Sequence, residues 1–259
     1  MRRVELVRDQ AAGLRRLFAS AATTYVPVAA TRGATGSLVA NLASACVRIG
    51  HSVLVVDQTP GEVATALGLA ARRELAHVIE GERDFAQVVL TADAGLSVLS
   101  ARRGLALLAE REHTLSQALA RIEGRFDLVL VHADPARLPA ALGPCMPDVV
   151  LPIVIAPDAL TAAYVEVKRS ARRGSGIRAL MHGVATPMAA RALFASLSGV
   201  AERFLDARPD YAGFVPSDPA LHRAVAARRT VFEIDPASPA ARALEFVAAT
   251  LGERRPTLA

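Results

Sequence analysis

Two glycines stand in a short turn of the kind that could hold a phosphate group. Gly33 and Gly36 follow the apolar run 25–30 and precede a stretch with helical spacing. Such a turn presents backbone N–H groups and a helix N-terminus to an anion. A working phosphate loop would carry lysine at position 37 and serine or threonine at 38 for Mg²⁺. Ser37 has no charge and Leu38 cannot ligate a hard cation, so the turn lacks the chemical groups of a phosphate loop.

Two further apolar runs end next to polar residues that could bind a ligand or take part in catalysis. Asp57 ends the run 52–57, and His132 follows the run 126–131. Asp57 could belong to a magnesium shell or cap the following turn, and the second interpretation is favoured because Leu38 supplies no companion ligand. His132 is interpreted as a hydrogen-bonded histidine at a strand end, since the pattern offers it no matched ligand or catalytic partner.

Alternating strands and helices must position these groups. The apolar runs and the 3.6-residue periodicity predict about seven strands separated by helices, without a Pro/Gly-rich linker between halves. The expected strands are 25–30, 52–57, 96–101, 126–131, 149–155, 177–184 and 211–215, and the expected helices are 7–20, 37–49, 114–123, 159–172, 188–205 and one after 236–239. We therefore expect an α/β fold with a single doubly wound, mostly parallel sheet over 21–259, preceded by a separate helical element over 1–20.

Composition sets the class of protein. Of the residues, 52% are hydrophobic and 4% aromatic, which suits small-residue helices packed on a valine-rich parallel sheet. No run approaches the roughly 18 apolar residues of a membrane span, and no apolar leader stands at the N-terminus, so a cytoplasmic protein is expected. The net charge of +5 comes from scattered arginines and is interpreted as a solvated surface, with no specific nucleic-acid partner. Cys46 is expected in the core, without a metal or disulfide role.

Several motifs together resemble a known family. Asp9-Gln10-Ala11-Ala12-Gly13-Leu14-Arg15 matches an N-terminal DQAxGLR element, and His77-Val78-Ile79-Glu80-Gly81 and Gly95-Leu96-Ser97-Val98-Leu99 match segments of the body. Tyr211-Ala212-Gly213-Phe214-Val215-Pro216-Ser217-Asp218 and Asp235-Pro236-Ala237-Ser238-Pro239 match the C-terminal half. The chain resembles the MinD/ParA group of deviant Walker-A ATPases, and within it the flagellar-number regulators of the FlhG/FleN (YlxH-like) type. The resemblance covers nearly the whole chain.

The resemblance implies a P-loop NTPase-like fold and an ATP site whose chemical groups are replaced here. Ser37 stands in the place of the phosphate lysine, Leu38 of the magnesium ligand and Thr59 of the water-orienting acid. His132 replaces a Walker-B-like acid, and His182 replaces the asparagine that reads adenine. We expect no catalytic residue, no metal and no resident cofactor, with weak ATP or ADP binding left open. The vestigial ATP site would comprise Arg32, Gly33, Gly36, Ser37, Asp57, His182 and Pro216.

The N-terminal element is the expected partner-binding region, through Asp9, Gln10, Leu14 and Arg15. By resemblance, its partner is the signal-recognition-type GTPase of flagellar placement (FlhF-like). A flagellar transcription activator, a C-ring protein and a second copy of the chain are further partners that the resemblance implies. The expected function is regulation of flagellar number or placement by a pseudo-ATPase.

The last helix carries Leu244, Phe246, Val247 and Leu251, and we expect it to dock on the domain rather than form a membrane anchor. Membrane contact would then be at most peripheral, at the inner membrane or cell pole. Two alternatives stay open: a working ATPase in which Arg32 supplies the phosphate charge, and a ParA-like positioning protein on nucleoid DNA.

Overall fold

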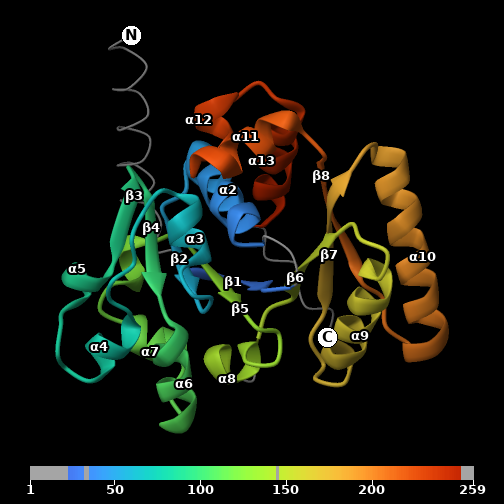
Figure 1. The fold of residues 1–259 in the computed structure, drawn as a ribbon. Helices are drawn as coiled ribbons and strands as arrows, with labels where there is room; N and C mark the ends of the chain where they lie inside the picture. Colours follow the sequence, from blue (N-terminus) through green and yellow to red (C-terminus); the bar gives the residue numbers. More distant parts are fainter. Residues whose placement is uncertain (1–22, 32–34, 144–145, 252–259) are drawn as a thin grey trace.

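The computed structural model describes residues 23–31, 35–143 and 146–251, which form one layered α/β unit (Figure 1). Eight strands form a single sheet in the order β3-β4-β2-β5-β1-β6-β7-β8. The strands are β1 (Thr24–Ala29), β2 (Val53–Asp57), β3 (Leu90–Asp93), β4 (Leu96–Ser100), β5 (Leu128–Ala133), β6 (Val149–Val154), β7 (Ile177–Val184) and β8 (Asp210–Pro216). All pairings are parallel except that of β3 with β4, so the expected fold class is confirmed.

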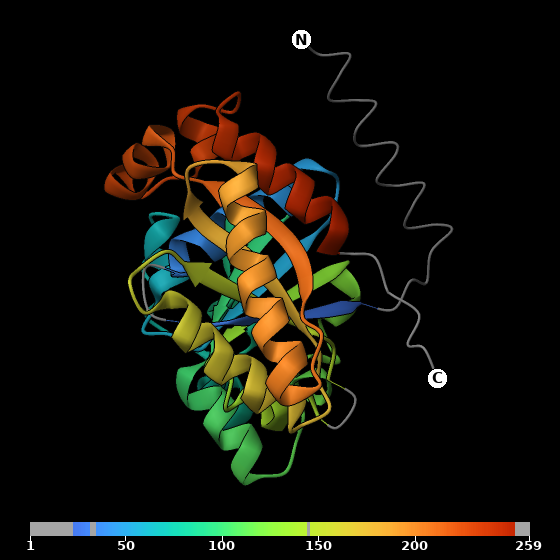
Figure 2. The same ribbon diagram turned by 90° about the vertical axis from the view of Figure 1, so that its right-hand side faces the viewer.

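Helices cover both faces of the sheet and connect successive parallel strands (Figures 1 and 2). The helices are α2 (Thr35–Arg48), α3 (Glu62–Ala66), α4 (Leu75–Ile79), α5 (Phe85–Val88), α6 (Arg102–Glu110), α7 (Leu115–Leu119), α8 (Leu138–Leu142), α9 (Ala159–Ala171), α10 (Pro187–Leu205), α11 (Pro219–Ala227), α12 (Val231–Ile234) and α13 (Pro239–Leu251), with a 3₁₀ turn η1 (Glu123–Arg125).

Two hydrophobic clusters lie on opposite faces of the sheet, because alternate side chains of a strand point to opposite sides. Val53 and Val55 of β2 pack with α2, α3 and α11–α13, whereas Leu54 and Val56 pack with the α4–α10 side. Every residue of β2 is buried. A strand buried on both faces needs a continuous apolar run, which explains why β2 and β5 are readily predicted.

Several elements differ from the sequence-based expectation, including the unpredicted helices α3–α6, α8, α11 and α12. The structure has eight strands rather than about seven, because β3 is a four-residue edge strand in which Thr91 and Asp93 alternate with apolar residues. The helix expected over 114–123 is interrupted: α7 ends at Leu119, and a 3₁₀ turn follows. The last helix docks on the sheet as expected, but Phe246 is 70% exposed and takes no part in the docking.

The expected division into a 1–20 element and a 21–259 domain is not tested by the fold, because residues 1–22 lie outside the described residues.

Candidate functional site: the ends of β1, β2 and β5

The predicted ATP-site residues fall in two places. Gly36 and Ser37 lie in the first turn of α2, and Asp57 is the last residue of β2. His182 and Pro216 lie in β7 and at the end of β8, which are separated from β1 by β6. Six predicted residues lie outside the described residues: Arg32 and Gly33 of the predicted ATP site, and Asp9, Gln10, Leu14 and Arg15 of the predicted partner-binding element.

A hydrogen-bonded relay joins Asp57 at the end of β2, His132 near the end of β5 and Thr35 in the first turn of α2. His132 Nδ1 lies 3.1 Å from Asp57 Oδ1, and His132 Nε2 lies 3.2 Å from the hydroxyl of Thr35. Thr35 is 1% exposed, and Asp57 and His132 are fully buried. We call this set the Thr35–His132–Asp57 relay. It makes His132 a hydrogen-bonded histidine at the end of its strand, which agrees with the sequence-based interpretation.

Strand register accounts for this juxtaposition. Asp57 pairs with His132 across β2 and β5, and Val28 pairs with His132 across β1 and β5. Because β5 lies between β1 and β2, a side chain at its end can reach both the last residue of β2 and the start of α2, which follows β1 in the chain. Thr35 then approaches from the first turn of α2.

Asp57 also receives three hydrogen bonds from the segment that follows it. Its Oδ1 accepts from the backbone N–H of Thr59 at 3.0 Å and from the Thr59 hydroxyl at 2.6 Å. Its Oδ2 accepts from the N–H of Val63 at 3.1 Å. Asp57 therefore caps the following turn and the start of α3, as one of the two sequence-based interpretations expected.

The residues here do not fit a magnesium ion. Leu38, at the position of the metal ligand in a working loop, is 2% exposed and packs in the hydrophobic cluster on α2. The Thr59 hydroxyl is already donated to Asp57, and the Asp57 oxygens accept from Thr59, Val63 and His132. A hard cation needs several free oxygen ligands, and these described side chains do not supply them.

Gly36 lies in close contact with the segment after β2. A Cβ added at Gly36 would lie 2.4 Å from Glu62 Cβ and 3.0 Å from the Glu62 carbonyl carbon. Only glycine permits this approach without displacing backbone. Gly36 therefore has a packing role between α2 and α3 that the glycine-rich pattern alone does not reveal.

The relay resembles the nucleophile–histidine–aspartate order of hydrolytic enzymes, but its burial argues against that chemistry. Such enzymes expose the nucleophile hydroxyl to substrate. The Thr35 hydroxyl is enclosed by protein, since Thr35 is 1% exposed. The relay therefore acts within the structure rather than on a substrate.

His182 and Pro216 form the other part of the predicted site. His182 is half-buried, and burial lowers its pKa below the ordinary value, with a smaller contribution from the nearby His222. Its Nδ1 atom has no hydrogen-bond partner among the described residues. Pro216 ends β8 just before Asp218, whose carboxylate caps α11 through the N–H of Ala220 at 2.8 Å. His182 and Pro216 lie near the carboxyl ends of the neighbouring strands β7 and β8. The register shows this, because His182 pairs with Val215 and Val184 pairs with Pro216.

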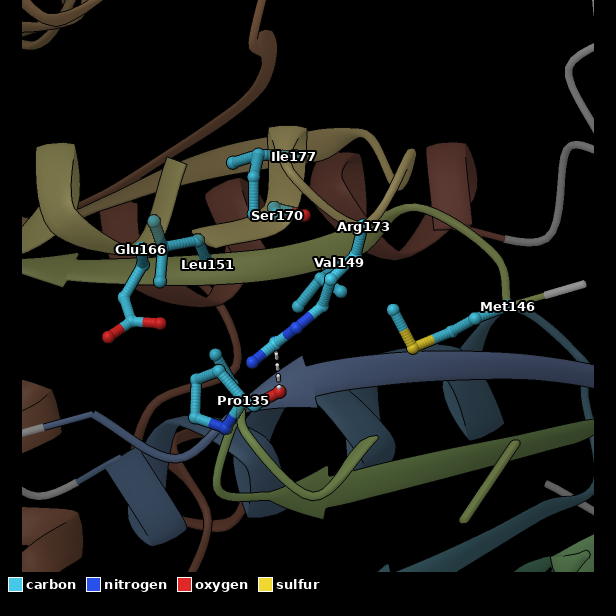
Figure 3. Close-up of a pocket in the computed structure, with 9 residues that line it drawn as sticks. Pro135, Met146, Val149, Leu151, Glu166, Ser170, Arg173 and Ile177 are labelled. Carbon is cyan, nitrogen blue, oxygen red and sulfur yellow. Dashed lines mark hydrogen bonds between the residues drawn. The ribbon is translucent and has the colours of Figure 1, made fainter. Parts of the chain in front are cut away.

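Two cavities were located away from the relay. One holds about 10 Å³, enough for a single water, and is bordered by Pro135, Glu166 and Arg173, with Arg173 donating to the carbonyl of Pro135 at 3.0 Å (Figure 3). The other is an open groove of about 300 Å³ between α9 and α10, two helices that lie side by side in Figure 2. The groove is lined by Leu160, Thr161, Tyr164, Ser196, Leu197 and Val200.

Helix α10 also carries exposed apolar residues, of which Val200 lines this groove. Val200 is 44% exposed, Phe204 65% and Met188 80%.

Within residues 23–31, 35–143 and 146–251, none of the helices combines the length and apolar composition needed to span a bilayer.

Thr35 and Glu62 are the residues that sequence reasoning missed. Thr35 lies inside the glycine-rich turn but was not assigned a role, and Glu62 belongs to a helix that was not predicted. The available signal was the position of Asp57 and His132 at the ends of two apolar runs, which indicates that polar side chains could meet there.

Comparison with solved structures identifies the class of protein. MinD of Aquifex aeolicus superposes with a TM-score of 0.68 at 18% identity, over 91% of this chain and 99% of MinD. MinD of Pyrococcus horikoshii, solved with Mg-ADP, gives a TM-score of 0.66 at 17% identity, over 90% of this chain and all of that one. The eight-stranded sheet and these superpositions thus define a protein with the MinD/ParA ATPase fold.

Sequence comparison narrows the class. The antiactivator FleN of Pseudomonas aeruginosa is 33% identical over 224 residues, which cover 80% of this chain and 78% of FleN. The chain therefore belongs to the FleN family within the MinD/ParA group. No family model matches the chain.

Proposed function

We propose that this protein regulates flagellar number or placement by binding other proteins, and that it does not hydrolyse ATP. Membership of the FleN family supports the regulatory part, because the related FleN is an antiactivator. The proposal extends that role to this chain and adds the loss of hydrolysis.

The observation that carries the loss of hydrolysis is the Thr35–His132–Asp57 relay. Phosphoryl transfer depends on charges that position and stabilise the transferred group. Here Asp57 is committed to internal hydrogen bonds and Leu38 to the core. Ser37 carries no charge in place of the lysine. Each such loss commonly removes about 2–4 kcal/mol of transition-state stabilisation, so the three losses together support a pseudo-ATPase.

The proposed partners are proteins of the flagellar system. The N-terminal element, with Asp9, Gln10, Leu14 and Arg15, would bind the flagellar signal-recognition-type GTPase and stimulate its GTP hydrolysis. The body would contact a flagellar transcription activator or a C-ring protein. Assembly into a homodimer and peripheral contact with the inner membrane or cell pole belong to the same proposal.

Titration calorimetry and a phosphate-release assay with Mg-ATP test the enzymatic part. We expect weak or absent binding and no turnover above the blank. The matched variant combines Ser37→Lys with Leu38→Thr, and we expect it to remain inactive because Asp57 and His132 stay hydrogen-bonded to each other. Micromolar binding with turnover by the wild type would instead favour a working ATPase that uses Arg32.

A GTPase assay with the flagellar signal-recognition-type GTPase tests the regulatory part. Deletion of residues 1–20 should abolish stimulation, because the partner-binding element is removed, whereas Ser37→Ala should leave stimulation unchanged. Stimulation that survives the deletion would contradict the proposed role of the N-terminal element. A change caused by Ser37→Ala would contradict a nucleotide-independent mechanism.

A further inference from the structure

We infer that the Thr35–His132–Asp57 relay takes over the structural role of a bound magnesium nucleotide and holds the segment 58–63 in one conformation without any ligand. This inference rests on the proposed loss of hydrolysis and adds a mechanism to it. Its consequence is that partner binding does not depend on ATP or ADP.

The first step is the polarity of the relay. An ionised carboxylate accepts hydrogen bonds and donates none. His132 must therefore carry its hydrogen on Nδ1 to donate to Asp57 at 3.1 Å. The other ring nitrogen, Nε2, lies 3.2 Å from the Thr35 hydroxyl, which also lies 3.4 Å from the carbonyl oxygen of Thr31. The chain of hydrogen bonds runs from α2 through β5 to β2 and satisfies both ring nitrogens of a fully buried histidine.

The second step is the set of donors around Asp57. The buried carboxylate receives hydrogen bonds from His132 Nδ1, Thr59 N, the Thr59 hydroxyl and Val63 N. Two of these donors are backbone amides of the segment that follows β2. Loss of these donors would leave a buried charge without partners, which is energetically unfavourable. The Asp57 carboxylate therefore keeps the segment after β2 hydrogen-bonded to it. A hard cation bound by Asp57 would need those same oxygens.

The third step is that other contacts fix the same segment. The N–H of Gln58 donates to the His132 carbonyl at 2.9 Å, and the Gln58 side-chain oxygen accepts from the N–H of Asp134 at 2.9 Å. Glu62 packs on Gly36 so closely that no side chain could stand there. The segment 58–63 is thus attached to β5 on one side and to α2 on the other.

Comparable segments in nucleotide switches are ordered by contacts with phosphate and Mg²⁺ and released when those contacts are lost. A segment already fixed by an aspartate, a histidine and a threonine has no such dependence. Side chains of the fold already order this segment, so a ligand is not needed to order it. Because the segment has no second conformation to be shifted, ligand binding should not change it.

Hydrogen–deuterium exchange on the full chain tests the inference, because the amides of Thr59 and Val63 themselves donate to Asp57. We expect slow exchange at 57–63 in the wild type, unchanged by Mg-ATP. In His132→Phe, which keeps an aromatic ring without ring nitrogens, exchange there should rise about tenfold or more, equivalent to about 1.4 kcal/mol of opening free energy. The matched control His182→Phe, in β7, should leave exchange at 57–63 unchanged.

Thr35→Val serves as a milder second variant in case His132→Phe does not fold, since it removes the hydroxyl and keeps the shape. It should raise exchange in 35–41 and, to a smaller extent, in 57–63. Slow exchange at 59 and 63 in both variants would overturn the inference. Protection of 57–63 by Mg-ATP in the wild type would overturn it as well.

The outcome is independent of whether the proposed partners are correct. Exchange is measured on the free chain, so a protein that fails to stimulate the flagellar GTPase can still show the ligand-independent segment. Conversely, stimulation of the GTPase combined with an Mg-ATP effect on 57–63 would retain the regulatory function and reject the role of the relay.

Discussion

The ends of β1, β2 and β5 and the outer surface of α9 and α10 use their side chains in opposite ways. At the strand ends, Asp57 and His132 are polar and fully buried. On α10, Val200 and Phe204 are apolar and largely exposed. Proteins normally expose polar groups and bury large apolar ones, and the informative residues are those that depart from this rule. Here the buried polar side chains hydrogen-bond to each other and connect the strand ends. The exposed apolar side chain of Val200 lines a groove that is open to solvent.

The largest effect expected at the strand ends comes from Asp57→Ala. The substitution leaves His132, Thr59 and Val63 without their acceptor in the interior. We expect a loss of about 3–5 kcal/mol in the free energy of unfolding measured with urea. The control Asp158→Ala removes an exposed aspartate whose side chain makes no capping hydrogen bond to α9, and it should change stability little. Equal effects of the two substitutions would remove the contrast between buried and exposed carboxylates.

A smaller effect is expected from Gly36→Ala. The new Cβ would lie 2.4 Å from Glu62 Cβ, so α2 and α3 must separate. Overpacking of this kind typically costs about 1–3 kcal/mol, measurable by the same urea titration. Adding Glu62→Gly removes the opposing Cβ and should recover part of the loss. A double variant no more stable than Gly36→Ala would show that the contact with the Glu62 backbone dominates.

The pH dependence of His182 should be weaker still. Burial lowers its pKa in the folded protein, with His222 as a second cause. The unfolded chain therefore takes up a proton near pH 6.5 that the folded chain does not bind, and stability falls as pH drops below that value. Urea titrations between pH 5 and 7.5 should show a shallower decline for His182→Gln than for the wild type. Identical profiles would show that His182 does not contribute.

The smallest effect on stability is expected on α10. Phe204 is 65% exposed, so Phe204→Ser should change the free energy of unfolding by less than about 0.5 kcal/mol. Thermal unfolding monitored by circular dichroism is sufficient to check this. A large destabilisation would mean that Phe204 packs in solution and that the two regions are less different than their burial indicates. If stability is unchanged, the variant can be used in partner-binding assays without ambiguity.

Most of the sheet was predictable because its signal is local. The runs 53–56 and 128–131 are apolar without interruption, as strands buried on both faces must be. The edge strand β3 gave no such signal, since Thr91 and Asp93 alternate with apolar residues over only four positions. Phe246 lies two positions from Leu244 and therefore on the opposite face of α13 from the buried residues 240, 244, 247, 248 and 251, which explains its exposure.

The candidate site was predictable only in part, because its contacts depend on register. Asp57 and His132 could be recognised as polar residues ending buried runs. That they face each other follows from the order in which β2, β5 and β1 pair, and local sequence does not determine that order. Thr35 lies in the glycine-rich turn, but its role follows from the position of the His132 ring, which the local sequence does not determine.

The burial of Leu38 has a consequence for how this sequence can change. Restoring a metal ligand by Leu38→Thr would place a hydroxyl in the hydrophobic cluster, and His132→Asp would set a second carboxylate beside Asp57. Each step is unfavourable until the others have been made. We therefore expect that a magnesium-binding site could be built here only by several substitutions together, and that the single substitutions would give less stable proteins.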